Sequence, residues 1–321
     1  MTTSTNTQPV SIRPLEERDL ENADRIFRLA FGTFLGFSTP ESFAGDSDFI
    51  RTRWRADPTA ALVAESNGAV VGSNMLTRWG SVGFFGPLTV HPSMWDRGIA
   101  KELLTPTMNI FDRWQVTHAG LFTFPHSAKH VGLYQKFGFW PRFLTMVMSK
   151  PVSERNIVAG QAIRFSQLGN SEKPDMLHEC RDLTDSIYPG LDVERETRAV
   201  DDQHLGDTIL AFDGSALVAF AVCHSGAGSE AGSGACYVKF GAVRPMSGAE
   251  QHFSSLLRAC EQFAIERKAT RLLAGVNTSR SQAYRSMLLQ GFRTEIQGVV
   301  MERGKDTGYN HEGVYLIDDW R

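Results

Sequence analysis

Three short motifs of the sequence recur at one constant spacing, and this repetition constrains the fold more than any other feature of the chain. Each motif returns 153 residues later: Pro92 as Pro245, Leu103-Leu104 as Leu256-Leu257, and Gly138-Phe139 as Gly291-Phe292. An offset shared by three separated motifs indicates an internal duplication. The chain of 321 residues is also long for one domain and comfortable for two. We therefore expect two similar folding units in tandem.

The boundaries of these units follow from composition. The first eight residues are polar and contain no apolar segment, which is typical of a loose terminus rather than of a signal peptide. The division that we predict is a disordered terminus (1–8), a first unit (9–152), a polar linker (153–161), a second unit (162–303) and a C-terminal tail (304–321). In the tail, Gly313 to Trp320 is strand-like, and we expect it to pair into one of the two sheets.

Periodicity assigns strands and helices to the first unit. Residues 10–14 alternate as a strand does, and residues 15–31 carry apolar side chains at helical spacing. Asn67-Gly68 stands between two alternating runs, which is the strongest short-range signal of a β-hairpin. Residues 32–48 mix Gly, Ser and Pro with phenylalanines. They form either a loop that buries aromatic side chains or a lid on the substrate side.

The stretch from Gly86 to Leu104 has the pattern of a phosphate-binding turn. A short apolar strand is closed by His91-Pro92, because proline cannot donate to a sheet ladder, and a helix begins at Gly98. Small residues let a ligand approach the backbone, and the first amides of a helix have no internal partners. The stretch matches neither G-x-G-x-x-G nor the G-K-S/T ending of a P-loop. We nevertheless expect it to bind a phosphate or pyrophosphate.

This turn resembles the pyrophosphate loop of the GNAT superfamily of acyl-CoA-dependent N-acetyltransferases. That loop is written Q/R-x-x-G-x-G/A and follows a strand ending in V-x-P; here it reads Trp95-Asp96-Arg97-Gly98-Ile99-Ala100 after Val90-His91-Pro92. Trp95 departs from the usual Gln or Arg, whereas the four residues from Arg97 to Ala100 are a common form. The alternative interpretation is an ordinary strand-to-helix turn made of small residues.

A second motif carries the same resemblance. Residues 130–139 read HVGLYQKFGF, where GNAT members often have N-x-x-A-x-x-L-Y-x-x-x-G-F. Tyr134 and the Gly-Phe pair match, while Ser127 stands where asparagine is usual and His130 where alanine is usual. In the family the tyrosine hydroxyl assists the leaving sulfur of coenzyme A, and a phenol with a pKa of about 10 holds its proton at neutral pH. Otherwise Tyr134 is a half-buried helix residue with a solvated hydroxyl.

The resemblance implies a fold and a co-substrate. The fold is α/β (an α+β mixed sheet), with a central mixed, mostly antiparallel sheet flanked by helices in each unit. Acetyl-CoA is the implied co-substrate, and no metal is expected. The residues implied to bind it are Leu88, Thr89 and Val90 along the pantetheine arm, Trp95, Asp96, Arg97, Gly98, Ile99, Ala100 and Lys101 around the pyrophosphate, and Ser127.

The implied reaction is transfer of an acetyl group to a primary amine, either a small amine or a protein amino group. A direct transfer is expected, because the first unit contains no cysteine to act as a nucleophile. A strand amide would polarise the thioester carbonyl. The mildly acidic chain favours cationic acceptors such as polyamines or aminoglycosides. The alternative is a non-catalytic module that binds acyl-CoA or regulates another protein, and the intact Tyr134 favours the enzyme.

The general base is harder to assign, because the strand before the turn carries no acid. Four histidines are near in sequence: His91, His118, His126 and His130. A histidine titrates at a pKa of about 6.5, and we choose His126 because it follows the strand that flanks the cofactor. A water chain to Glu65 or an acid in the lid would serve equally. The spacing of His126 and His130 also fits metal ligands, but no third ligand is near.

The same offset indicates that the second unit has lost its chemistry. Gly98 maps to Gln251, Ala100 to Phe253 and Tyr134 to Met287. Bulky side chains would occupy the space of the pyrophosphate, and methionine has no proton to give. We therefore expect a degenerate, structural second unit, whose sequence is also interrupted by a Gly/Ser-rich loop from Ser225 to Gly234.

Composition indicates which classes of partner and which cellular compartment to expect. The net charge of −3 offers no basic footprint for nucleic acid, and no apolar run is long enough for a membrane span. The cysteines have neither C-x-x-C spacing nor a secretory context, so we interpret them as reduced packing residues of a cytoplasmic protein: Cys180, Cys223, Cys236 and Cys260. We expect a monomer or a homodimer.

Overall fold

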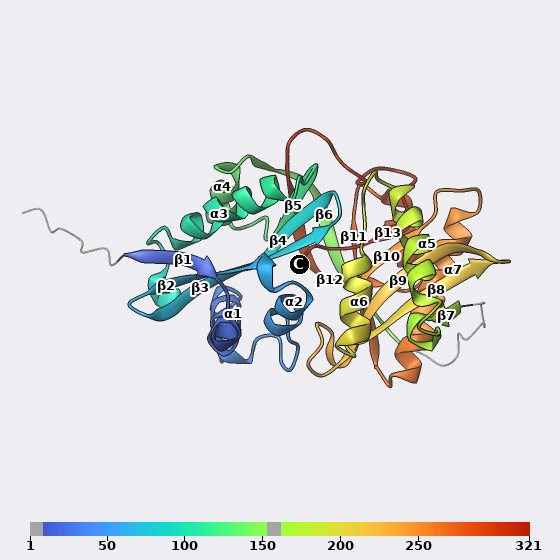
Figure 1. Cartoon of the computed structure of the whole chain (residues 1–321), viewed down its shortest axis with the longest axis horizontal. Coiled ribbons are helices and arrows are strands. Elements are labelled where there is room, and N and C mark those ends of the chain that lie inside the picture. The colour runs from blue at the N-terminus through green and yellow to red at the C-terminus, as the bar shows by residue number, and fades with distance from the viewer. Residues whose placement is uncertain (1–8, 153–161) are drawn as a thin grey trace, which may run out of the picture.

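The computed structural model describes residues 9–152 and 162–321. The predicted disordered terminus and the predicted linker therefore lie outside the described residues. We call residues 9–152 the first half and residues 162–321 the second half. Figure 1 shows the two halves next to each other, with helices on both faces of the strands.

The described part of the first half contains these elements: β1 (Val10–Pro14), α1 (Leu20–Phe34), α2 (Ile50–Ala56), β2 (Ala61–Ser66), β3 (Ala69–Trp79), β4 (Val82–Val90), α3 (Ile99–Arg113), β5 (His118–Thr123), α4 (Ala128–Gln135) and β6 (Phe139–Pro151). The described part of the second half contains β7 (Ala162–Arg164), α5 (Lys173–Asp185), α6 (Glu194–Asp202), β8 (Gly206–Asp213), β9 (Ala216–Gly226), β10 (Gly232–Val243), α7 (Ala249–Glu266), β11 (Arg271–Asn277), α8 (Ser281–Leu289), β12 (Arg293–Arg303) and β13 (Leu316–Ile317). Short 3-10 turns connect several of them.

All described strands belong to a single sheet in the order β1-β2-β3-β4-β5-β12-β6-β11-β10-β9-β8-β7, with β13 paired to β10. Only the pairs β4–β5 and β10–β11 are parallel. The predicted fold class, a mixed and mostly antiparallel sheet flanked by helices, is confirmed. One detail differs from the expectation of a sheet for each unit, because the two halves share their sheet and exchange strands at its centre.

The exchange involves the last long strand of each half. β12 of the second half lies between β5 and β6 of the first, with Val299 opposite Thr123. β6 of the first half pairs in turn with β11 of the second, with Val147 opposite Gly275. The predicted limits at residues 152 and 162 therefore separate two repeats in the sequence, whereas the sheet continues across them.

Helices cover both faces of the first half because alternate strand residues point to opposite faces. Ala61 and Val63 of β2 pack with α1 and α2, whereas Leu62 and Ala64 pack with α3. The second half repeats this arrangement, with α5 and α6 on one face and α7 and α8 on the other. The cluster under α5 and α6 reaches into the first half, where Trp79 is 1% exposed.

The local predictions agree with the structure in several places. Asn67 and Gly68 have φ angles of 51° and 76°, as a tight hairpin turn requires, and they connect β2 to β3. The strand-like tail segment forms β13, which joins the strands of the second half. The four cysteines are free and buried, which confirms their interpretation as packing residues. The helices α2, α5 and α6 were not predicted.

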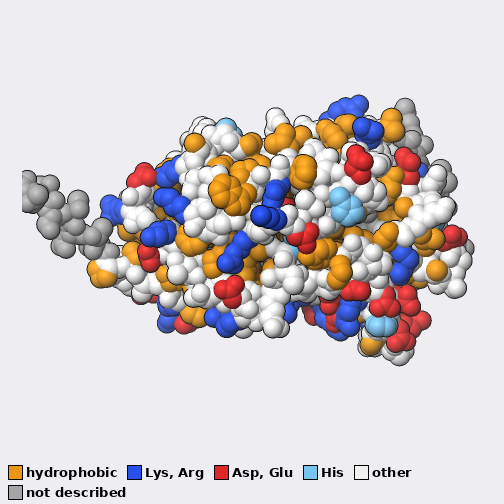
Figure 2. Space-filling view, turned by 90° about the horizontal axis from the view of Figure 1, so that it is seen from above, with side chains coloured by type: hydrophobic (Ala, Val, Ile, Leu, Met, Phe, Trp, Pro, Cys, Tyr) orange, Lys and Arg blue, Asp and Glu red, His pale blue; other side chains and the backbone are white. Residues whose placement is uncertain are grey.

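Charged and hydrophobic side chains are mixed on the face of the molecule that Figure 2 shows. On the face shown in Figure 2, acidic and basic side chains are interspersed and the hydrophobic side chains form separate groups. None of the described helices combines the length and the apolar character needed to cross a bilayer.

Candidate active site

The pairing of β4 with β5 stops partway along both strands. The strands pair from Val82 and His118 to Phe84 and Gly120, and β4 then continues to Val90 without β5 as its neighbour. β5 instead pairs with β12 on its other side. The edge of β4 beyond Phe84 therefore faces a space between two strands, which we call the β4–β5 opening.

Backbone groups of Leu88 and Val90 point into this opening. The amide of His91 donates to the carbonyl of Val71 on the β3 side, and backbone groups alternate between the two edges of a strand. Thr89 therefore faces β3, and its side chain is buried. Of the three strand residues predicted to contact a ligand, Leu88 and Val90 direct their amides to the opening and Thr89 does not.

A bulge at Gly86 separates this edge from the paired part of β4. The register between β3 and β4 shifts here, Gly86 has a φ angle of 148°, and Pro87 follows it. Because Pro87 has no amide hydrogen, the first donor beyond the bulge that faces the opening is the amide of Leu88. The carbonyl of Gly86 accepts a hydrogen bond of 2.6 Å from Nη1 of Arg53 in α2.

The predicted phosphate turn follows directly after β4. It passes through Asp96, whose φ angle is 66°, to Gly98, whose φ angle is 81° and which is the N-cap of α3. A Cβ on Gly98 would meet no atom within 4 Å. Glycine at this position therefore satisfies a left-handed backbone and leaves the space in front of the helix free.

Free donors are concentrated in this turn. Within the described residues, no acceptor is found for the amides of residues 96–100. The amide of Trp95 donates to the carbonyl of Pro92, and that of Lys101 to the carbonyl of Gly98. The amides available to an anion are therefore those of residues 96–100, which is a smaller set than the predicted range of residues 95–101. They lie at the positive end of the α3 dipole.

Side chains hold the turn against its neighbours. Nε1 of Trp95 donates to the carbonyl of Val90 at 2.7 Å, so the residue that departs from the GNAT pattern anchors the turn to β4. Nζ of Lys129 in α4 lies 2.5 Å from Oδ1 of Asp96, while Arg97 is exposed. Ile99 packs into the core below α3.

Tyr134 lies in α4 on the same face as α3. Its ring centroid is 5.7 Å from that of Phe85, the residue that precedes the bulge, and its exposed fraction is 7%. Burial raises the pKa of Tyr134 well above its ordinary value. The hydroxyl therefore keeps its proton at neutral pH, and its ring lies against Phe85 of β4. Ser127 is the N-cap of the same helix.

His126 and His130 lie where the end of α1 meets the start of α4. The ring of Phe34 stacks on His126 with centroids 5.8 Å apart, and it lies 5.1 Å from His130. Phe124, at the end of β5, is 5.8 Å from His126. Burial, with smaller effects from Lys129 and His126, lowers the pKa of His130, whereas His126 is exposed.

The other titratable residues considered as the base form contacts away from this cluster. Nδ1 of His91 lies 2.8 Å from Oγ of Ser93. His118 is buried beside Glu302, on the face that carries Trp320. Glu65 accepts a hydrogen bond from Arg13 at the β1–β2 edge of the sheet, so the suggested water chain to Glu65 would have to cross β3. No group of three or more potential metal ligands is found in the described ranges.

The second half begins its corresponding helix differently. The offset of 153 residues holds for Val90 and Val243 at the strand ends, but α7 begins at Ala249 with Gly248 as its N-cap, at a φ angle of 86°. The mapping of Gly98 onto Gln251 therefore needs a correction: the left-handed glycine is Gly248, and the connection before it is shorter. Gln251 lies within the additional first turn of α7, and Phe253 follows that turn and is completely buried.

The opening between β10 and β11 is filled by the chain itself. These strands pair only as far as Val238 and Ala274, and β13 then pairs with β10 at Gly241 and Ala242. At the offset of 153, these two residues correspond to Leu88 and Thr89. A Cβ on Gly275 of β11 would lie 2.2 Å from Cβ of Asp319, so the segment after β13 fits closely against β11.

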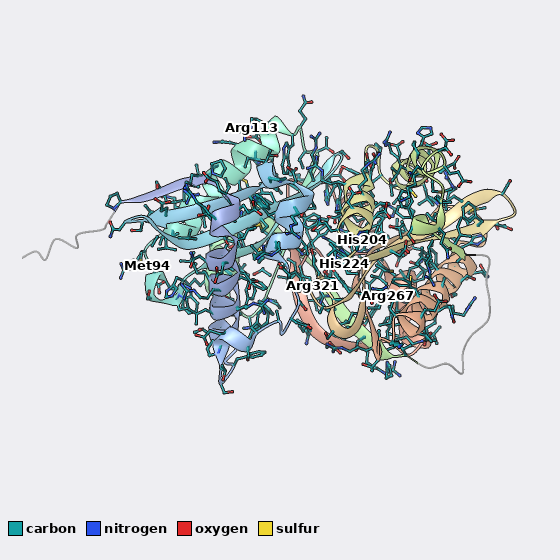
Figure 3. All side chains as sticks on the ribbon, turned by 60° about the horizontal axis from the view of Figure 1, so that its bottom comes forward. Met94, Arg113, His204, His224, Arg267 and Arg321 are labelled. Carbon is teal, nitrogen blue, oxygen red and sulfur yellow. The ribbon has the colours of Figure 1, made fainter. Side chains whose placement is uncertain are left out.

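The same segment continues to the base of the β4–β5 opening. Trp320 stacks on Phe84, with centroids 5.6 Å apart and planes at 8°, and its ring occupies the space beside Gly120. Arg321 follows at the junction of the halves, where Figure 3 also shows His224. The sequence did not predict that residues of the tail reach the first half, because only the strand character of the tail is visible in its pattern.

The comparisons with known proteins agree with this geometry. Residues 23–139 match the model of the acetyltransferase (GNAT) family. This part of the chain is therefore a GNAT acetyltransferase domain, and it contains β4, the phosphate turn and Tyr134. No match was found among curated protein sequences.

Solved structures share the fold over nearly the whole chain. A protein of Pyrococcus horikoshii provisionally classed as an acetyltransferase has a TM-score of 0.68 at 17% identity, over 97% of this chain and 95% of that one. A GCN5-related N-acetyltransferase of Sphaerobacter thermophilus has a TM-score of 0.60 at 15% identity, over 92% and 95%. A tandem GNAT protein from the clavulanic acid biosynthesis pathway has a TM-score of 0.58 at 12% identity, over 93% and 100%. At these identities the likeness shows a shared fold, and the proteins that share it include a tandem GNAT protein.

Proposed function

We propose that the chain is an acetyl-CoA-dependent N-acetyltransferase whose reaction takes place in the first half. The observation that carries this proposal is the β4–β5 opening, with the unpaired amides of Leu88 and Val90 along one side. Amides without an acceptor follow in residues 96–100, at the start of α3. One elongated ligand with a diphosphate and an amide-containing arm satisfies both sets of donors, and acetyl-CoA has this chemistry.

The residues of the first half have separate roles in cofactor binding and catalysis. The amides of residues 96–100 hold the pyrophosphate, with Ser127 and Lys101 nearby, and those of Leu88 and Val90 hold the pantetheine arm. The amide of Leu88 is also the donor nearest to the bulge, so it polarises the thioester carbonyl. The amine attacks that carbonyl directly, and Tyr134 gives its proton to the sulfur as the C–S bond breaks.

The acceptor is a primary amine, of a small molecule or of a protein. We place its entry beside the cluster of rings at the end of β5 and the start of α4, which consists of Phe34, Phe124, His126 and His130. His126 is the proposed base that removes the proton of the ammonium group, because its ring is the exposed one of the two histidines in this cluster. His130 is the second candidate, since a lowered pKa keeps its ring neutral below the ordinary range of histidine.

The second half is proposed to have no site of its own. Its opening is occupied by β13, its helix α7 is longer at the start, and Met287 stands at the position of Tyr134 and is completely buried. We propose that one chain binds one acetyl-CoA, without a metal, and acts in the cytoplasm as a monomer or homodimer.

The test is to incubate the protein with acetyl-CoA, a panel of amines and a reagent that reports free thiol. We expect release of coenzyme A that depends on one class of amine, and acetylated amine in equal amount. Tight binding of acetyl-CoA with no release for any amine would instead support the non-catalytic acyl-CoA module. Absence of binding would contradict both assignments.

A further inference from the structure

The Gly/Ser-rich hairpin between β9 and β10 joins the second half to the acceptor side of the first. The amide of Asp48 donates to the carbonyl of Ser229 at 3.0 Å. The amide of Ser233 donates to Oδ1 of Asp46 at 2.8 Å. Asp46 and Asp48 belong to the segment between α1 and α2, which the sequence suggested as a lid. This hairpin therefore holds one wall of the acceptor side.

The same hairpin reaches β4 through a buried ion pair. Glu230 accepts two hydrogen bonds from Arg53, at 2.9 Å from Nε and 2.8 Å from Nη2. Arg53 uses its remaining nitrogen, Nη1, for the carbonyl of Gly86 at the bulge, and Nη2 also donates to the carbonyl of Arg321. The side chains of Glu230 and Arg53 are 0% and 4% exposed.

We propose that Glu230 of the second half, acting through Arg53, is a positioning residue for acetyl transfer in the first half. This inference rests on the proposed function. The guanidinium is a rigid planar fork, so the carboxylate that accepts two of its N–H groups fixes where the third one points. That third group holds Gly86, two residues before the Leu88 amide that polarises the thioester. The orientation of the reacting strand is thereby set by a residue outside the GNAT domain.

The surroundings of Glu230 make its charge permanent. Burial opposes ionisation, but Arg53 and Lys239 hold the pKa of Glu230 far below its ordinary value. Nζ of Lys239 lies 2.8 Å from the same carboxylate. Glu230 is therefore no candidate for the general base: it remains ionised at every working pH, and its effect on the reaction comes from geometry.

Glu230→Gln tests this inference, because glutamine has the same shape but replaces an acceptor by a donor. We expect kcat to fall about 10-fold to 100-fold, since a small displacement of reacting groups has this effect. The KM for acetyl-CoA should change less than about twofold, because the amides of residues 96–100 are untouched. Hydrogen exchange of the amides in residues 85–90 should become faster.

The matched control is Glu261→Gln. Glu261 of α7 also forms a buried pair across the halves, at 2.7 Å from Nζ of Lys150, but it has no contact with β4. This variant should lose a similar amount of thermal stability and keep its kcat. If Glu230→Gln does not fold, Arg53→Lys gives the same test, because one ammonium nitrogen cannot reach Gly86, Glu230 and Arg321 together.

Two results would overturn the inference. One is a folded Glu230→Gln variant with the kcat of the wild type; the other is an equal loss of kcat in Glu261→Gln. A wild-type protein that turns over no amine would instead contradict the proposed function. In that case the exchange rates of residues 85–90 still decide whether Glu230 positions β4.

Discussion

The two halves contain the same break in a parallel strand pair and use it in opposite ways. In the first half, β4 and β5 separate beyond Phe84, and the β4 edge remains without a strand partner. In the second half, β10 and β11 separate beyond Val238, and β13 enters the space and pairs with β10. One opening is thus available to a ligand, and the other is occupied by the tail of the chain.

Under the proposed function, this difference explains how a duplicated binding site is lost while the fold is kept. Strands that diverge leave backbone groups unpaired, and such groups must find a partner when they are buried. In the second half the chain's own backbone is that partner, and in the first half the proposed partner is acetyl-CoA. The second half therefore keeps its packing, and Gly248 still begins α7 as Gly98 begins α3.

The largest effect that distinguishes the halves is expected from Tyr134→Phe. Loss of the proton donor should lower kcat by about 10²-fold to 10⁴-fold, with little change in the affinity for acetyl-CoA measured by calorimetry. Because burial raises the pKa of Tyr134, the wild-type kcat should show no decline from this group up to a pH of about 10. Tyr284→Phe in α8 is the control, and an equal loss there would contradict the assignment of chemistry to the first half.

The second prediction concerns the filled opening. Leu316 of β13 is completely buried, so Leu316→Ala should lower the free energy of unfolding by about 2–5 kcal/mol in chemical denaturation. The variant should still bind a single acetyl-CoA per chain in calorimetry, because α7 and Met287 are unchanged. A second binding event would show that β13 alone had closed a functional site.

A smaller effect is expected from His224 at the junction of the halves. Burial lowers the pKa of His224 to about 4, with Glu230, Lys239, Glu196 and Arg53 around it. In the folded protein His224 is therefore protonated at a lower pH than in the unfolded chain. Its contribution to the free energy of unfolding is complete above a pH of about 6.5 and is lost as the pH falls toward 4. Between pH 7 and 4.5 this loss should reach about 2 kcal/mol.

The measurement is urea denaturation of the wild type and of His224→Asn across this range, because the difference cancels the titration of carboxylates. The stability advantage of the wild type should shrink as the pH falls. A constant difference would mean that His224 has the same pKa in the folded and the unfolded state, which would contradict the expected shift.

The smallest effects are expected from a matched pair of glycines. Gly98→Ala and Gly248→Ala should each cost about 1 kcal/mol of stability, because both residues have left-handed backbones. Only Gly98→Ala should also weaken acetyl-CoA binding, by about tenfold, since its Cβ would enter the space in front of α3. Equal affinities of the two variants in calorimetry would contradict the location of the pyrophosphate.

Local sequence patterns predicted the elements that make up the candidate site. The stretch from Gly86 to Ala100 has a strand, a left-handed glycine and a helix start in the predicted order, because each depends on neighbouring residues only. The same is true of the Asn67-Gly68 hairpin. The direction of Thr89, which faces β3 and not the opening, was not predicted. It depends on strand register, and the bulge at Gly86 shifts that register.

Long-range features could not be predicted in this way. The contact between Arg53 and Glu230 spans 177 positions in the sequence, and the strand order places β12 between β5 and β6. The offset of 153 residues gave the correct partner for Tyr134, but it failed at Gly98, where the connection before α7 is shorter. An offset is reliable inside elements and unreliable where a loop changes its length.

The exchanged strands limit how this protein can move. Three ladders join the halves, and separating them would break all three: β5 with β12, β12 with β6, and β6 with β11. A movement that admits a substrate and keeps these ladders is therefore confined to the segments around the sheet. For the same reason, a fragment comprising residues 9–152 alone would leave one edge of β5 and both edges of β6 without the partners they have here, and would tend to aggregate.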